Sequence, residues 1–161
     1  MIMQCVMLCY LLLALATSVE AQTGESGKSC GRQEAIQAET EASSLQNWEE
    51  MFQSYKNFNH CDDGAIWEGY SDSIARLLSE NWHSAGQLSH LVSQDRNFEG
   101  FILRHIDELM SPEQAEKIRR NADTDCPLHA KRLCTAISDR LKAVSGGESG
   151  KTDREPADVR R

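Results

Sequence analysis

The apolar side chains of this 161-residue chain recur at intervals of three and four residues from Ser44 onward. Such spacing lines them along one face of an α-helix, whereas a half-buried strand alternates apolar and polar positions. Leu45, Trp48, Phe52 and Tyr55 mark the first of these stripes. No run of β-branched or aromatic residues shows the two-residue period of a strand, so the sequence predicts an all-α fold.

Start and stop signals divide the pattern into separate helices. Asp62 or Asp63 can cap one helix, and Asp95 can start another. The clearest boundary is the Ser-Pro-Glu-Gln sequence beginning at Ser111, which offers an N-cap hydroxyl, a proline at the first helical position and a glutamine that completes a capping box. A last helix is expected to start near Pro127. We therefore predict a compact bundle of five or six short helices held by disulfides.

Composition changes along the chain predict four segments. A short apolar stretch from Val6 to Leu15 is followed by a small-residue cleavage site that ends at Ala21, a pattern typical of a signal peptide. We divide the chain into residues 1–21 (signal peptide), 22–43 (polar N-terminal arm or helix), 44–144 (helical domain) and 145–161 (disordered tail). The mature protein is then expected to be periplasmic or secreted, with no membrane contact after cleavage.

Four cysteines follow the predicted signal peptide: Cys30, Cys61, Cys126 and Cys134. An even number in an exported protein predicts two disulfides, with three possible pairings. If a helix began near Pro127, eight residues would separate Cys126 from Cys134 by about 12 Å, which is too far for a disulfide. This reasoning favours long-range pairs such as Cys61 with Cys126 or Cys134.

The charge of the chain limits its partners. It has 17 lysines and arginines against 25 aspartates and glutamates, a net charge of −8. An acidic chain without a basic run lacks the means to neutralise phosphates, so we expect no nucleic-acid partner. A basic protein would be attracted instead.

Residues of the types that bind metals lie close together in the sequence: His60, Cys61, Asp62, Asp63 and Glu68. Their spacing matches no established metal-binding motif. Structural roles are the stronger interpretation, because the aspartates can cap a helix and the cysteine can form a disulfide. We predict no metal site and no cofactor.

His105 lies in the most apolar stripe of the chain, where an imidazole could serve as a general base. The stripe consists of Phe98, Phe101, Ile102, His105, Ile106 and Leu109. No serine or cysteine carries the motif of a nucleophile, so we predict no catalytic residue. The alternative is a metal-binding or hydrolytic envelope protein that uses His60, Asp62, Asp63 and His105, and it requires these groups to converge in a cleft.

Aromatic and acidic residues near the second predicted helix are typical of a protein-binding patch. We expect the partner to contact Phe58, Asp62, Asp63, Trp67, Glu68 and Asp72. Such a patch needs no catalytic group. The function we predict is therefore that of an exported, non-enzymatic protein-binding module, with an inhibitor or immunity-like role, whose protein partner the sequence does not identify.

Three blocks carry a resemblance to known proteins: His60–Leu78, Phe101–Asp107 and the ending from Cys126 to Cys134. Together they resemble a group of small exported proteobacterial proteins of unknown function, over about residues 52–140. In architecture alone, an exported helical domain with disulfides is similar to the periplasmic immunity proteins that inhibit type VI secretion amidases. The first resemblance implies no activity, and the second implies binding to an enzyme.

Overall fold

The computed structural model describes residues 28–148, which fold into seven α-helices and three short 3₁₀ turns without a strand. The elements are α2 (Arg32–Ala42), α3 (Trp48–Phe58), η2 (Asn59–Cys61), α4 (Gly64–Glu80), η3 (Trp82–Ser84), α5 (Ala85–Gln94), α6 (Arg96–Arg104), α7 (Pro112–Thr124), η4 (Leu128–Ala130) and α8 (Lys131–Glu148). The predicted all-α class is confirmed. No helix within this range is long and apolar enough to cross a membrane.

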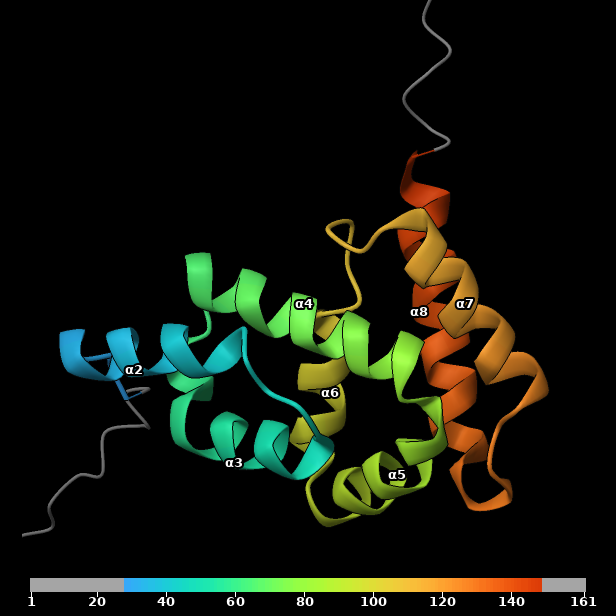
Figure 1. Cartoon of the computed structure of the whole chain (residues 1–161), viewed down its shortest axis with the longest axis horizontal. Helices are drawn as coiled ribbons and strands as arrows, with labels where there is room; N and C mark the ends of the chain where they lie inside the picture. The colour runs from blue at the N-terminus through green and yellow to red at the C-terminus, as the bar shows by residue number, and fades with distance from the viewer. Residues whose placement is uncertain (1–27, 149–161) are drawn as a thin grey trace, which may run out of the picture.

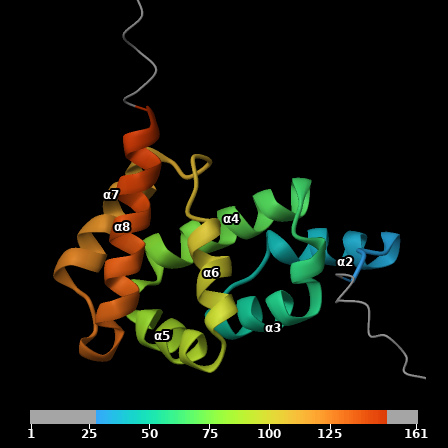
Figure 2. The ribbon, with the colours of Figure 1, turned by 180° about the vertical axis from the view of Figure 1, so that it is seen from behind.

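Helix α4 is the central element of the bundle (Figure 1). It packs against α2 at one end and against α7 at the other. Helices α7 and α8 lie side by side and run in opposite directions, whereas α2 and α3 form the far end of the molecule (Figure 1). Seen from behind, α6 crosses in front of α4 (Figure 2), and it also contacts α5 and α8. The centre of the molecule therefore lies between α4 and α6.

Aromatic rings from three helices fill that centre. The ring of Phe101 on α6 lies 5.0 Å from Tyr55 on α3 and 5.0 Å from Tyr70 on α4, measured between centroids. Phe52 meets Phe98 edge to face at 4.9 Å. These separations are those at which tilted and edge-on ring pairs attract each other. The stripes read from the sequence thus converge on one core.

Side-chain caps start the helices where the sequence predicted them. The Asp63 carboxylate accepts from the backbone N–H of Gly64, and the Asp95 carboxylate from that of Asn97. Ser111 forms the complete capping box with Gln114. Each cap satisfies an N–H group that has no partner inside its helix. The Ser111 box thus fixes the end of the segment that joins α6 to α7.

Gly69 permits a close approach of α4 to the end of α2. A Cβ atom at this position would lie 3.0 Å from the Cβ of Ala42 and 3.0 Å from the backbone nitrogen of Ser43. Glycine lowers the helix propensity of α4, and the gain is a tight contact with the end of α2. Gly64, with φ of 53°, starts α4 in a backbone conformation that other residues rarely adopt.

The segment predicted as a polar arm or helix contains helix α2, of which Ala38 and Ala42 are fully buried. Two helix ends differ from the prediction. Helix α6 ends at Arg104, so Leu109 leaves the predicted stripe and is 59% exposed. Helix α8 continues to Glu148, past the predicted end at residue 144. The predicted signal peptide, residues 22–27 and the remainder of the predicted tail (149–161) lie outside the described residues.

Two disulfides are present, as predicted, but the favoured pairing was wrong. Cys30 is bonded to Cys61 and Cys126 to Cys134, with Cα–Cα distances of 4.9 and 6.2 Å. The distance argument failed because the last α-helix starts at Lys131 and not near Pro127. Pro127 has extended dihedral angles and the 3₁₀ turn η4 follows it, so the chain changes direction between the two cysteines.

The two disulfides should stabilise the fold unequally. In the chain-entropy model, the Cys30–Cys61 loop, with a sequence separation of 31, contributes about 4 kcal/mol, and the shorter Cys126–Cys134 loop contributes about 2.5 kcal/mol. Replacing each pair by serines should lower the free energy of unfolding by these amounts. Urea denaturation measures both values, and an equal or reversed order would contradict the expectation.

A buried hydrogen bond predicts how the core responds to alkali. Tyr70 Oη and Ser54 Oγ lie 2.8 Å apart, and burial raises the pKa of Tyr70 from 10.0 to about 12. The unfolded chain then loses the tyrosine proton first, so stability should fall as the pH rises from 10 towards 12. Replacing Tyr70 by Phe should make this loss shallower.

The same substitution should destabilise the protein at neutral pH by about 1–3 kcal/mol, because the buried Ser54 hydroxyl loses its partner. Combining it with Ser54→Ala should recover part of the loss. Thermal unfolding of both variants at pH 7 and at pH 11 tests these expectations. If wild-type protein and Tyr70→Phe lost the same stability between pH 7 and pH 11, Tyr70 would not contribute to the pH dependence.

Candidate functional site

The four residues of the predicted enzymatic or metal-binding alternative do not converge. His60 lies on η2 and faces Glu34 of α2, with 3.5 Å between Nε2 and Oε2. Asp63 is occupied in capping α4. Only Asp62 and His105 meet, with 3.1 Å between Oδ2 and Nε2. The structure thus separates the set: His60 lies beside Glu34, Asp62 lies beside His105, and Asp63 caps α4.

His105 is the centre of a buried polar network. It follows the last residue of α6, and its side chain has no exposed surface. Its Nε2 faces Asp62, and its Nδ1 lies 3.0 Å from Ser71 Oγ. The ring also packs against the indole of Trp67, with 4.1 Å between centroids. The sequence placed His105 on an apolar face, and the structure adds the polar partners that satisfy it there.

Asp107 anchors the other end of this network. One of its oxygens accepts hydrogen bonds from Ser71 Oγ at 2.8 Å and from Trp67 Nε1 at 2.9 Å, both on α4. Its other oxygen accepts from the backbone N–H of Leu109 at 2.9 Å. A carboxylate with three donors is a strongly held group. The turn that follows α6 is therefore fixed to α4.

The network resembles a serine–histidine–aspartate triad in composition but differs from one in its bonding. A serine nucleophile must give its hydroxyl hydrogen to the histidine. The single hydroxyl hydrogen of Ser71 is directed to Asp107, because a carboxylate only accepts, and Ser71 is just 4% exposed. His105 Nδ1 lies 3.0 Å from the same hydroxyl oxygen. The arrangement serves to hold α4 and the turn after α6 together.

The residues predicted to contact a partner are divided between the core and the surface. Phe58 and the Asp62 side chain are each 6% exposed. Trp67 is half-buried against the network, whereas Glu68 and Asp72 are exposed on α4. The sixth residue of the set, Asp63, is also exposed, in its capping position. The aromatic part of the predicted patch thus belongs largely to the interior.

Glu68 and Asp72 line a hollow of about 340 Å³ that the sequence did not reveal. Leu109 and Met110 provide its apolar wall, and Gln114 of α7 lies at its edge. Periodicity assigned Leu109 to a helix and to the core. The Ser-Pro boundary at Ser111 was the only available indication that the preceding residues turn away from α6.

A second hollow, of about 460 Å³, lies on the other side of this turn, between α7 and α8. Its apolar lining comes from Met110, Pro112, Ala115, Leu141 and Val144. Met110 borders both hollows. The turn after α6 therefore forms a ridge between them. The ridge is fixed from behind as well, because the Arg140 side chain on α8 donates to the carbonyl of Ile106 at 2.9 Å.

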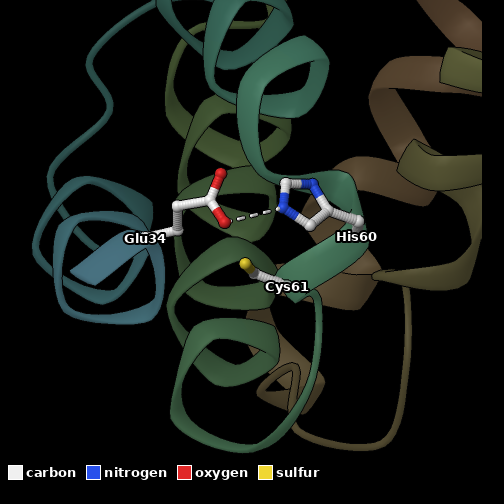
Figure 3. Close-up of side chains that lie close together, drawn as sticks. All are labelled: Glu34, His60 and Cys61. Atoms are coloured by element: carbon white, nitrogen blue, oxygen red, sulfur yellow. Dashed lines mark ion pairs between the residues drawn. The ribbon is translucent and has the colours of Figure 1, made fainter. Parts of the chain in front are cut away.

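Metal-ligand atoms gather at one place in residues 28–148: a Glu34 oxygen, a His60 nitrogen and Cys61 Sγ lie within 4.8 Å of one another (Figure 3). The Lys28 ammonium and the Gly31 N–H donate hydrogen bonds to Glu34 and lower the pKa of this carboxyl to about 2. Cys61 Sγ is bound in the disulfide, so the oxidised protein offers a metal only the imidazole and the carboxylate.

Comparison of the chain with protein-family models, with curated proteins and with solved structures found no match. The site must accordingly be interpreted from its own geometry. Its main features are the buried network around His105 and the ridge, with exposed acidic residues on α4, that this network supports.

Replacing Ser71 by Ala should show what the network contributes. The change removes the hydroxyl between His105 and Asp107 and leaves a buried imidazole nitrogen without a partner, at a cost of about 1–3 kcal/mol. The matched control is Ser79→Ala on the same helix. Ser79 is equally buried, but its hydroxyl contacts only the Arg76 carbonyl at 3.4 Å. The free energy of unfolding, measured by urea denaturation, should therefore change by less than about 0.5 kcal/mol for the control. Equal losses of stability in both variants would contradict the role assigned to Ser71.

Proposed function

We propose that this protein is an exported, non-enzymatic module that binds a basic segment of another protein. The contact surface comprises Glu68, Asp72, Leu109 and Met110, and we name it the acidic–apolar surface. The observation that carries the proposal is the exposure of Leu109 on a turn that the Asp107 hydrogen bonds hold in place. An exposed apolar anchor beside charged residues is typical of protein interfaces.

The turn is suited to binding because little of it has to be ordered on contact. Ordering a loop at an interface costs free energy that a fixed loop does not spend. The side chain of Asp107 bonds to both Ser71 and Trp67 of α4, and Arg140 of α8 bonds to the turn from the other side. Leu109 is thus presented by a rigid support.

Charge favours a basic partner. Glu68 and Asp72 lie on the same hollow as Leu109, and the whole chain carries a net charge of −8. An electrostatic field of this sign accelerates the association of a cationic partner and slows that of an anionic one. The occupant that we propose for the hollow is a protein segment with a lysine or arginine next to an apolar residue.

A binding module of this kind fits an inhibitory role in the periplasm or outside the cell. Two disulfides are typical of proteins in such oxidising compartments. A rigid helical surface can block the active site of an enzyme without any chemistry of its own. The burial of Ser71, which is only 4% exposed, supports this function over hydrolysis. We propose a cell-wall-active enzyme as the partner class.

Capture of partners by matched variants tests the proposal. Leu109→Ser should weaken retention of the partner about tenfold or more, since the loss of a buried leucine anchor at an interface costs about 1.5–3 kcal/mol. Leu128→Ser is the control, because Leu128 is a leucine that is 84% exposed on η4, outside the acidic–apolar surface. Immobilised oxidised proteins would be incubated with envelope and secreted extracts, and the retained proteins quantified by mass spectrometry.

A protein held by wild type and by Leu128→Ser but lost from Leu109→Ser would support the surface. Glu68→Lys combined with Asp72→Lys should release the same protein, and higher salt should weaken its binding to wild type. If Leu109→Ser and Leu128→Ser retained the same proteins in the same amounts, the acidic–apolar surface would be excluded as the contact.

A further inference from the structure

We propose that reduction of the Cys30–Cys61 disulfide creates a Zn²⁺ site, with the two thiolates, His60 Nε2 and the Glu34 carboxylate as ligands. The site is independent of the acidic–apolar surface. The metal would take the place of the disulfide in linking the segment before α2 to η2.

The ligand atoms already lie near the distances that zinc requires. One atom each from Glu34, His60 and Cys61 gather within 4.8 Å of one another, and Figure 3 shows the carboxylate and the imidazole pointing towards each other above the sulfur. Tetrahedral zinc with thiolate and imidazole ligands holds its ligand atoms about 3.3–3.8 Å apart. Cys30 Sγ is bonded to Cys61 Sγ and provides the fourth ligand at the same place.

Nε2 of His60 has no hydrogen-bond partner. This nitrogen is buried, and Glu34 Oε2 lies 3.5 Å away. This distance exceeds that of an ordinary N–H···O hydrogen bond. The side chain is only 13% exposed. A buried ring nitrogen that points at a carboxylate and a sulfur is placed as a metal ligand would be.

The Glu34 carboxylate accepts hydrogen bonds from the Lys28 ammonium and from the Gly31 N–H, and its Oε2 lies 3.5 Å from His60 Nε2. The Lys28 side chain is 63% exposed and can return to water when a metal ion takes its place. Two thiolates, an imidazole and a carboxylate are all ligands that zinc accepts.

The redox step needs a dithiol reductant. The dithiol transfers two electrons and two protons to the disulfide, the S–S bond breaks, two cysteine thiols form, and the dithiol closes to a cyclic disulfide. Binding of Zn²⁺ then releases the two thiol protons to solvent. No other reactant is required, and reoxidation is prevented while the metal holds both sulfurs.

The second disulfide provides an internal control. Among the residues that the structure describes, only the Glu34–His60–Cys61 group has three potential metal ligands within 4.8 Å of one another, so Cys126 and Cys134 lack this environment. A variant that keeps only Cys30 and Cys61 should bind zinc after reduction. A variant that keeps only Cys126 and Cys134 should not.

The experiment uses the full-length chain with Cys5→Ser and Cys9→Ser in every variant, so that these two cysteines do not bind metal. Each variant is reduced with dithiothreitol, desalted without oxygen and titrated with Co²⁺, whose thiolate charge-transfer and tetrahedral d–d bands report the ligands. Zn²⁺ competition then gives the affinity. We expect one equivalent of metal in the variant with Cys30 and Cys61, and none in its oxidised form.

His60→Ala and Glu34→Gln should each weaken metal binding at least tenfold, whereas His129→Ala should leave it unchanged. Circular dichroism shows whether the reduced chain is folded, and zinc-induced recovery of helix would also support the site. The proposal is overturned if the reduced protein binds no metal, folded or not. It is also overturned if His60→Ala binds as tightly as its parent, or if Cys126 and Cys134 alone bind equally well.

Discussion

The hydrogen bonds of Asp107 are the interaction on which the position of the acidic–apolar surface depends. Helix α6 ends at Arg104, and the chain has to turn before α7 begins at Pro112. Asp107 fixes this turn because it accepts bonds from two side chains of α4 and from its own backbone at Leu109. Asp107 is buried, and an unpaired carboxylate in such a place would be costly. The turn is therefore held in one conformation, and its exposed residues keep a defined position.

The buried network around His105 supports the acidic–apolar surface. Below the surface, His105 joins Asp62, just before α4, to Ser71, about two turns into the helix. Above it, Leu109 and Met110 stand between two hollows, with exposed acidic residues on α4 beside them. The acidic residues of the predicted patch have separate roles. Asp62 stabilises the interior together with Asp107, which was not part of that patch, whereas Glu68 and Asp72 are exposed on α4.

The sequence predicted the helices well because their determinants are local. Apolar periodicity located the buried faces, and the Asp63, Asp95 and Ser111 caps started the helices as expected. Predictions that required distances between elements were weaker. The disulfide pairing was wrong since it assumed a helix directly after Pro127. Periodicity assigned Leu109 to the core, because the spacing of apolar residues does not show that α6 already ends at Arg104.

By itself, the sequence determined an acidic, all-helical chain with paired cysteines, because these properties follow from composition and from contacts between near neighbours. Tertiary structure alone decided which residues meet. It joined His105 to Asp62 and Ser71, residues 43 and 34 positions away, and it placed Glu34 beside His60 and Cys61. Such contacts depend on how whole helices pack, and helix packing is set by the summed shape of many side chains and not by any local pattern.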